Sequence, residues 1–93
     1  MITTTSWTVY FLRCSDNSLY TGITTDISRR IIEHNTSKLG AKYTRARRPV
    51  ILAYQESAID KSSAAKREYQ LRTLPKSKKE LLVKQYKMTQ QVC

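Results

Sequence analysis

One carboxylate falls on a helix face that is otherwise apolar, and it is the first side chain for which chemistry has to be considered. The segment 60–74 has helical spacing. Glu68 lies between Ala64 and Leu71 on the stripe that should face a core. A carboxylate in that position costs free energy unless a cation pairs with it or it holds a metal ion. Because lysine and arginine are abundant in this chain, a salt bridge and a metal site are both open interpretations of Glu68.

A second helix face carries a cation and an imidazole. Arg30 and His34 are one turn apart. They share their face with Ile27 and Ile31. Taken alone, His34 is expected to be a capping or surface residue. Considered beside Glu68, the pair is better explained as a candidate site, because a guanidinium stabilises phosphoryl charge and an imidazole titrates near neutral pH.

Two tyrosines and a glycine occupy a predicted β-hairpin. If its loop is residues 15–17, so that Cys14 pairs with Ser18, Tyr10 lies opposite Gly22. The same register places Tyr20 on the same face as Tyr10, and the glycine leaves open space beside Tyr10. A loop one residue longer would separate the two faces. Two ordinary strand-favouring tyrosines are the alternative interpretation.

The elements that must hold these residues follow from apolar periodicity and turn residues. Thr25 or Asp26 is predicted to cap the first helix, and Asp60 the second. In order, the predicted elements are strand 7–13, strand 19–24, a helix to about Asn35, a long loop over 36–49, strand 50–54, a helix to about Leu74 and a basic helix over 77–88.

This order, β-β-α-β-α-α, predicts an α/β fold of the α+β kind, in which a small three-stranded antiparallel sheet is flanked by helices. A hairpin alone is marginal in water, so the third strand is expected to complete the sheet. The length of 93 residues suits a single domain over 1–93. Residues 1–6 are expected to be disordered.

Charge is the dominant global property of the chain. Seventeen lysine and arginine residues against seven acidic residues give a net charge of +10. Self-repulsion of this size destabilises a small fold, whereas a polyanionic partner would relieve it through counterion release. The sequence therefore predicts a nucleic acid as the partner, most simply DNA. A basic protein without catalytic activity remains the alternative.

Composition also excludes several classes of protein. No apolar run approaches the roughly 18 residues of a membrane span, and no secretory signal is recognisable, so a cytoplasmic location without membrane contact is expected. No protein partner is indicated. Cys14, Cys93 and one histidine cannot build a zinc site at a usual spacing. A metal ion, if used, would be a hard cation held by oxygen.

The ordered set of these residues resembles the GIY-YIG nucleases. In that family, a strand motif ending in tyrosine is followed by Tyr-x-Gly, by a helix with an essential arginine, and later by a metal-binding glutamate. The resemblance covers residues 7–75 and is greatest to the small stand-alone bacterial members. The matching residues here are Tyr10 in Thr8-Val9-Tyr10, Tyr20 and Gly22 in Tyr20-Thr21-Gly22, Arg30, His34, and Glu68 in SAAKREYQLRTL.

The resemblance implies a role for each candidate catalytic residue. Glu68 would hold one Mg²⁺ or Mn²⁺ ion, largely ligated by water. Arg30 would stabilise charge on the phosphoryl group. Tyr10 would be the general base or would orient the attacking water, and His34 is the second candidate for the base. Tyr20 would orient the nucleophile or the phosphate.

The segment between the first helix and the third strand is strongly basic. It is predicted to contact phosphates, and its aromatic residue to stack on bases. A solvated flexible loop is the alternative. The candidate nucleic-acid-binding residues are Lys42, Tyr43, Arg45, Arg47 and Arg48.

Two functional hypotheses follow. The first is a single-metal endonuclease acting on DNA or another structured nucleic acid, with a role in DNA repair or recombination. The second is a non-catalytic nucleic-acid-binding module that keeps the fold. Both predict affinity that falls with salt, but only the first predicts cleavage that depends on Glu68 and on a divalent metal.

Overall fold

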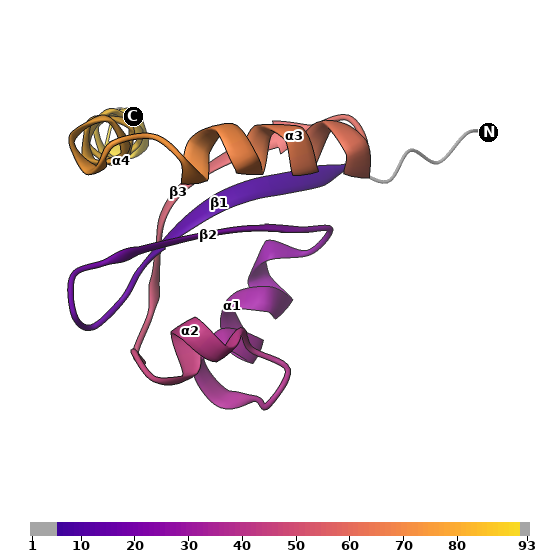
Figure 1. The fold of residues 1–93 in the computed structure, drawn as a ribbon, viewed down its shortest axis with the longest axis vertical. Coiled ribbons are helices and arrows are strands. Elements are labelled where there is room, and N and C mark those ends of the chain that lie inside the picture. The colour runs from indigo at the N-terminus through magenta and orange to yellow at the C-terminus, as the bar shows by residue number, and fades with distance from the viewer. Residues whose placement is uncertain (1–5, 92–93) are drawn as a thin grey trace.

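The computed structural model describes residues 6–91. The expectation of disorder at residues 1–6 lies outside the described residues, except for Ser6. The elements are β1 (Trp7–Arg13), β2 (Leu19–Thr24), α1 (Ile27–Thr36), α2 (Lys42–Arg45), β3 (Ile51–Ala58), α3 (Lys61–Arg72) and α4 (Lys76–Gln91) (Figure 1).

The predicted α+β order of elements is confirmed, with two differences. A short helix, α2, interrupts the segment 36–49 that was expected to be a loop. The third strand continues to Ala58, past its expected end at Tyr54, because Ala58 pairs with Trp7 at the start of β1. β3 is an edge strand, and its polar residues after Tyr54 hide this continuation in the sequence.

The strands form one antiparallel sheet in the order β2-β1-β3. The predicted hairpin register is confirmed, since Tyr10 pairs with Gly22 and the backbone N–H of Cys14 donates to Ser18. Asn17 closes the loop with a φ of 70°, a left-handed conformation that asparagine tolerates. Tyr10 and Tyr20 therefore share one face of the sheet.

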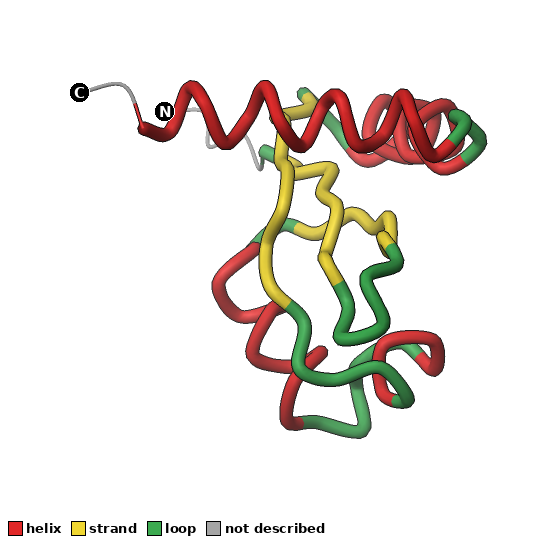
Figure 2. The backbone as a smooth tube through the Cα atoms, turned by 90° about the vertical axis from the view of Figure 1, so that its left-hand side faces the viewer, coloured by secondary structure: helices red, strands yellow, loops and turns green. Residues whose placement is uncertain are grey.

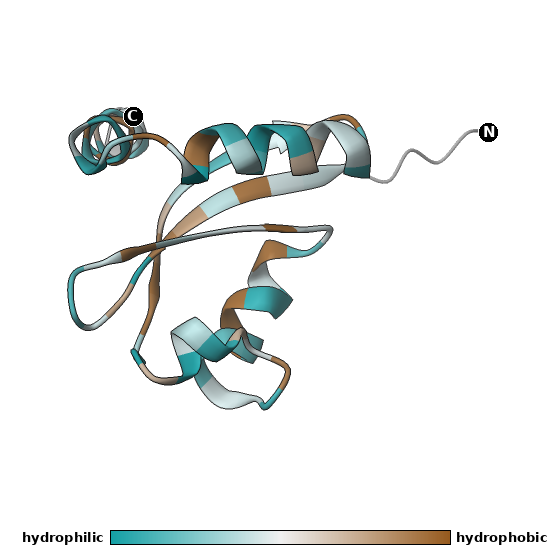
Figure 3. Ribbon diagram, in the orientation of Figure 1, coloured by the Kyte–Doolittle hydropathy of each residue, from teal (hydrophilic) through white to brown (hydrophobic). Residues whose placement is uncertain are grey.

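The central strand β1 is buried on both faces, and alternation sends its side chains into two separate cores. Val9 and Phe11 pack with Ala64 and Leu71 on the side of α3 and α4. Tyr10 is on the opposite side, where α1 and α2 lie. Figure 1 shows the two helix pairs on opposite sides of the sheet, and Figure 2 shows α4 crossing one end of it. In Figure 3, hydrophobic residues appear on the ribbons of both β1 and α1.

Helices α1 and α3 start at the predicted caps, Asp26 and Asp60. The carboxylate of Asp26 accepts a hydrogen bond from the Arg29 backbone N–H, and that of Asp60 accepts one from Ser63. Each bond satisfies a backbone donor that a helix start leaves unpaired. Among residues 6–91, no helix combines the length and apolar character that crossing a membrane requires.

The segment after α1 folds back against the end of that helix. The guanidinium of Arg48 donates to the backbone carbonyls of Glu33, His34 and Ser37. The Asn35 amide also exchanges two hydrogen bonds with the backbone of Val50, at 2.8 and 2.9 Å. Carbonyls at a helix C-terminus lack intrahelical donors, so a cation placed there is favourable. These bonds give the predicted loop a fixed path.

We expect Arg48→Ala to lower the free energy of unfolding by about 2 kcal/mol, because three carbonyls lose a charged donor. The matched control is Arg45→Ala, which removes the same charge from an exposed side chain of α2 and should change stability by less than about 0.5 kcal/mol. Urea denaturation of both variants measures the difference. Equal stability of the two variants would contradict the capping role of Arg48.

Candidate active site

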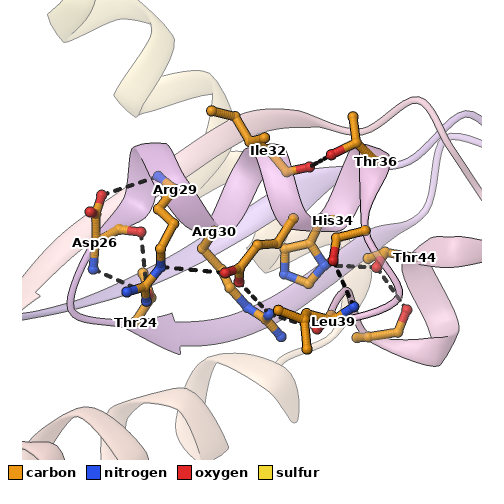
Figure 4. Close-up of polar contacts among 12 residues, drawn as sticks. Thr24, Asp26, Arg29, Arg30, Ile32, His34, Thr36, Leu39 and Thr44 are labelled. Atoms are coloured by element: carbon orange, nitrogen blue, oxygen red, sulfur yellow. Dashed lines mark hydrogen bonds and ion pairs between the residues drawn. The ribbon is translucent and has the colours of Figure 1, made fainter.

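His34 lies at the centre of a chain of hydrogen bonds in the interior. Its side chain is fully buried, so the expectation of a capping or surface histidine was wrong. The ring Nε2 lies 2.9 Å from the Tyr10 hydroxyl, and Nδ1 lies 2.7 Å from Thr44 Oγ1. Thr44 in turn donates to the Ala41 carbonyl at 2.9 Å. Figure 4 shows His34 of α1 and Thr44 of α2 turned toward each other.

This chain fixes the tautomer of His34. A threonine hydroxyl has one proton, and Thr44 gives it to Ala41. Thr44 Oγ1 must therefore accept from His34, which places the ring proton of a neutral imidazole on Nδ1. Nε2 is then an acceptor, and the Tyr10 hydroxyl donates to it. The two candidate bases are thus one hydrogen-bonded pair.

Burial keeps both members of the pair uncharged. Loss of solvation, with a smaller contribution from the nearby Arg30, lowers the pKa of His34 to about 4. Burial also raises the pKa of Tyr10 to about 12, with a smaller contribution from Tyr20. The guanidinium of Arg30 lies close enough to the Tyr10 hydroxyl to oppose this rise. At neutral pH, the pair is a phenol donating to a neutral imidazole.

Gly22 leaves room for this arrangement, as the sequence predicted. A Cβ atom at this position would lie 2.5 Å from Tyr10 Oη and 3.1 Å from the Tyr20 ring. No side chain fits at the first of these distances unless Tyr10 moves, and moving Tyr10 would break its bond to His34. The glycine therefore serves the packing of the two tyrosines and not the turn of the hairpin.

Tyr20 lies between the pair and the protein surface. Its ring meets the His34 ring edge-on, with centroids 5.3 Å apart, and lies nearly parallel to the ring of Tyr43 at 6.0 Å. Burial raises the pKa of Tyr20, Arg30 of α1 lowers it, and Glu68 of α3 raises it. The pKa of Tyr20, which lies on the edge strand β2, therefore depends on charges on both sides of the sheet.

Arg30 and Glu68 are both held by ion pairs within their own helices. Arg30 Nη1 lies 2.8 Å from Glu33 Oε1 and donates to the Leu39 carbonyl (Figure 4). Glu68 Oε1 lies 3.0 Å from Arg72 Nε. The salt bridge considered for Glu68 is therefore present. About a fifth of each side chain is exposed, 23% for Arg30 and 22% for Glu68, so both are accessible to a ligand.

The candidate site fits a metal ion that takes most of its ligands from water and substrate. Residues 6–91 contain no cluster of three or more histidine, cysteine or acidic side chains, which excludes a site built by the protein alone within that range. Glu68 offers one carboxylate, near enough to Tyr20 to raise the pKa of that phenol. Mg²⁺ keeps several water ligands and often binds one carboxylate together with substrate phosphate. A single glutamate such as Glu68 fits that coordination, because water and substrate would supply the other ligands.

The basic segment divides into two groups in the structure. Lys42 and Arg45 are exposed. Arg47 pairs with Asp16 at 2.9 Å and lies over the ring of Tyr43 at 3.8 Å. Arg48, as described above, binds the end of α1. The first group is free to meet a ligand, whereas in the second group Arg47 holds α2 and Arg48 holds the end of α1.

Two residues near the site, Thr44 and Arg72, were not predicted. Thr44 orients His34, and Arg72 lies beside Tyr20 together with Lys79 of the predicted basic helix. The role of Thr44 could not be predicted from the sequence, because it depends on how α2 packs against α1. The spacing of Arg72, four residues after Glu68 on one helix, is the typical signal of an ion pair.

Comparison with known proteins identifies the family. Residues 6–81 match the model of the GIY-YIG catalytic domain, and the chain belongs to this family, a superfamily of nucleases. The predicted resemblance is confirmed.

The relatives are small bacterial proteins of the UPF0213 group. The chain is 56% identical over 79 residues to a UPF0213 protein of Desulfotalea psychrophila, covering 85% of this chain and 72% of the relative. It resembles the solution structure of a UPF0213 protein from Bacillus halodurans, with a TM-score of 0.54 and 46% identity over 85% of this chain and 83% of the other. The chain also resembles the solution structure of a protein from E. faecalis, with a TM-score of 0.59 and 38% identity over 95% of this chain and 93% of the other.

The low pKa of His34 predicts how stability depends on pH. The unfolded chain protonates its only histidine near pH 6.5, whereas the folded protein resists protonation until about pH 4. Stability from this source is present above pH 6.5 and is lost as the pH falls toward 4. We expect a loss of about 2 kcal/mol between pH 7.5 and pH 5.

Urea denaturation at these two pH values, for the wild type and His34→Gln, measures this contribution. The variant has no histidine left, so its stability should fall less than that of the wild type over this interval. Equal pH dependence in both proteins would show that His34 titrates normally in the fold.

Proposed function

We propose that this protein is a metal-dependent endonuclease that hydrolyses phosphodiester bonds in DNA or another structured nucleic acid, in the cytoplasm. The observation that carries the proposal is the Tyr10–His34 hydrogen bond, which joins a hydroxyl to a neutral imidazole acceptor beside Arg30. Membership of the GIY-YIG family supports the same activity.

Glu68 is the residue proposed to hold one Mg²⁺ or Mn²⁺ ion together with water and the substrate phosphate. Such an ion, when bound, supplies positive charge to the phosphoryl group and the leaving oxygen. Glu68 must then release Arg72, its present partner. Because that ion pair is partly exposed, its loss costs little, about 1 kcal/mol or less.

Arg30 is proposed to bind the scissile phosphate and, in doing so, to open the way to Tyr10. The Tyr10 side chain is only 1% exposed, and Arg30 lies against its hydroxyl. A phosphate group attracts the guanidinium more strongly than the Leu39 carbonyl does. When Arg30 turns to the phosphate, a water molecule gains access to Tyr10 Oη.

Tyr10 and His34 then act as one base. The attacking water transfers a proton to Tyr10 Oη while the Tyr10 proton passes to His34 Nε2. The water oxygen bonds to phosphorus as the bond from phosphorus to the leaving oxygen breaks, and the leaving oxygen keeps that electron pair and takes a proton from solvent water. The imidazolium that forms keeps its Nδ1–H bond to Thr44. Phosphate neutralises Arg30, a cation that lowers the pKa of His34, so the proton is more easily accepted with substrate bound.

The remaining candidates are proposed to bind the nucleic acid backbone. Tyr20 would orient the phosphate or the water, since Arg30 and Glu68 are both near enough to act on its pKa. Lys42 and Arg45 are exposed, and with a net charge of +10 they favour a polyanion. Arg47 and Arg48 contribute mainly by holding α2 and α1. Tyr43 offers an aromatic surface beside them.

A non-catalytic nucleic-acid-binding module is the second candidate. The Glu68–Arg72 ion pair favours it, because a glutamate that only stabilises α3 would make the same contact. The two candidates differ in what they require of the Glu68 carboxylate.

We expect Glu68→Gln to stay folded and to bind DNA, but to lose divalent-dependent cleavage by about 100-fold or more, the scale of one lost electrostatic contact in a transition state. The melting temperature and the cleavage rate are measured on the same preparation, with Mg²⁺, with Mn²⁺ and with EDTA. Labelled duplex, flap, junction and single-stranded substrates are compared.

The matched control is Glu56→Gln, which removes a similar ion pair, with Arg67, at the opposite edge of the sheet. It should cleave as the wild type does. An active Glu68→Gln protein would refute the metal assignment. Absence of cleavage by the wild type on every substrate would favour the binding module.

A further inference from the structure

A pocket of about 280 Å³ opens at the free edge of β2, next to the candidate active site. Apart from Tyr20 and Tyr43, its residues have no binding role in the proposed reaction. Its volume is near the lower limit for small-molecule sites and suits a single compact group. The lining residues are Leu19, Tyr20, Thr21, Tyr43, Arg72 and Lys79.

One wall of the pocket is aromatic. The rings of Tyr20 and Tyr43 are inclined by only 27° and come from different elements, β2 and α2. Tyr43 is 39% exposed, so part of its side chain is accessible from solvent. Arg47 lies over one face of the Tyr43 ring, so a nucleic acid base would meet the part of this wall that stays exposed. Accessible aromatic side chains and arginine guanidinium groups in a basic protein are typical stacking partners of nucleic acid bases.

The floor of the pocket is the unpaired edge of a strand. Cys14 forms a hydrogen-bonded pair with Ser18, so alternation along the hairpin turns the backbone groups of Leu19 and Thr21 away from β1. Thr21 is only 7% exposed, and its Oγ1 atom has no hydrogen-bond partner among residues 6–91. A buried hydroxyl without a partner is unusual and is consistent with a ligand that supplies one.

Two cations complete the pocket from the other side of the sheet. Arg72 comes from the end of α3 and Lys79 from the first turns of α4. Lys79 is half-buried and makes no ion pair within the described part of the chain. Arg72 is held by Glu68, the residue proposed to exchange it for a metal ion. That bond uses only Nε of the half-exposed guanidinium, so the rest of the Arg72 head group can meet an anion in this pocket with or without a metal ion.

We propose that this pocket binds one unpaired nucleotide of the substrate strand, with its base against Tyr20 and Tyr43 and its phosphate on Lys79 and Arg72. A base inside a duplex is stacked on both faces, so only an unpaired or extruded base can present a face to this wall. The inference rests on the proposed function, because Tyr20 belongs to both sites. It names the substrate class as DNA with an unpaired nucleotide beside the scissile phosphate.

Fluorescence anisotropy in EDTA tests this site without cleavage. The probes are a labelled hairpin duplex with a short thymidine overhang and the same DNA with abasic positions in the overhang. Tyr43→Leu should bind the thymidine overhang about tenfold more weakly than the wild type, whereas Tyr43→Phe should retain affinity. The abasic overhang should weaken wild-type binding to the same extent and leave Tyr43→Leu unchanged.

Lys79→Ala tests the phosphate position against Lys84→Ala, which removes an equal charge from an exposed site on the same helix outside the pocket. Lys79→Ala should cause the larger loss of affinity, and thermal melts confirm that each variant is folded. Equal losses for the two lysine variants, or equal losses of Tyr43→Leu on thymidine and abasic overhangs, would overturn the proposal. Binding in EDTA is independent of Glu68-dependent cleavage, so failure of either proposal leaves the other measurement unaffected.

Discussion

The hydrogen bond between Tyr10 and His34 is the constraint on which the rest of this small structure depends. Both groups are removed from water, and a buried donor or acceptor without a partner costs free energy. Each therefore needs the other at hydrogen-bond distance, which is 2.9 Å here. Three features satisfy that requirement: Gly22 clears the space for the tyrosine ring, α1 carries the imidazole, and Thr44 fixes its tautomer.

The geometry of the sheet explains why the candidate site lies at the edge of β2. Tyr10 faces α1, whereas Glu68 is on α3 on the other side of the sheet. A carboxylate on that side reaches the α1 side only around an edge strand. Tyr20 lies on this strand, and its pKa responds to both Arg30 and Glu68. A site with residues from both sides of the sheet therefore requires β2, the strand that carries Tyr20, to be an edge strand, with β1 in the centre.

Much of the fold could be predicted from the sequence because local chemistry determines it. The turn residues 15–17 and strand alternation predicted the register that pairs Tyr10 with Gly22. Aspartates before apolar-periodic segments predicted both helix starts. The spacing of Tyr10, Tyr20, Arg30, His34 and Glu68 was sufficient to recognise the GIY-YIG family.

What could not be predicted depends on tertiary contacts between segments far apart in the chain. The burial of His34 results from α2 closing over α1, and the propensities of residues 36–49 indicate only a loop. Arg48 was indistinguishable from its basic neighbours until the position of the α1 carbonyls was known. The pairing of Glu68 with Arg72 was one of two interpretations that the sequence left open, and the exposed ion pair is compatible with either.

The most direct test of this account is the ¹⁵N NMR spectrum of the His34 ring, which is the only imidazole in the chain. The chemical shifts of the two ring nitrogens, followed from pH 8 to pH 4, report the tautomer and the pKa together. The account predicts a proton on Nδ1, an unprotonated Nε2 accepting from Tyr10, and a neutral ring until the pH approaches about 4. A proton on Nε2 in the neutral ring, or titration near the ordinary value of 6.5, would contradict it.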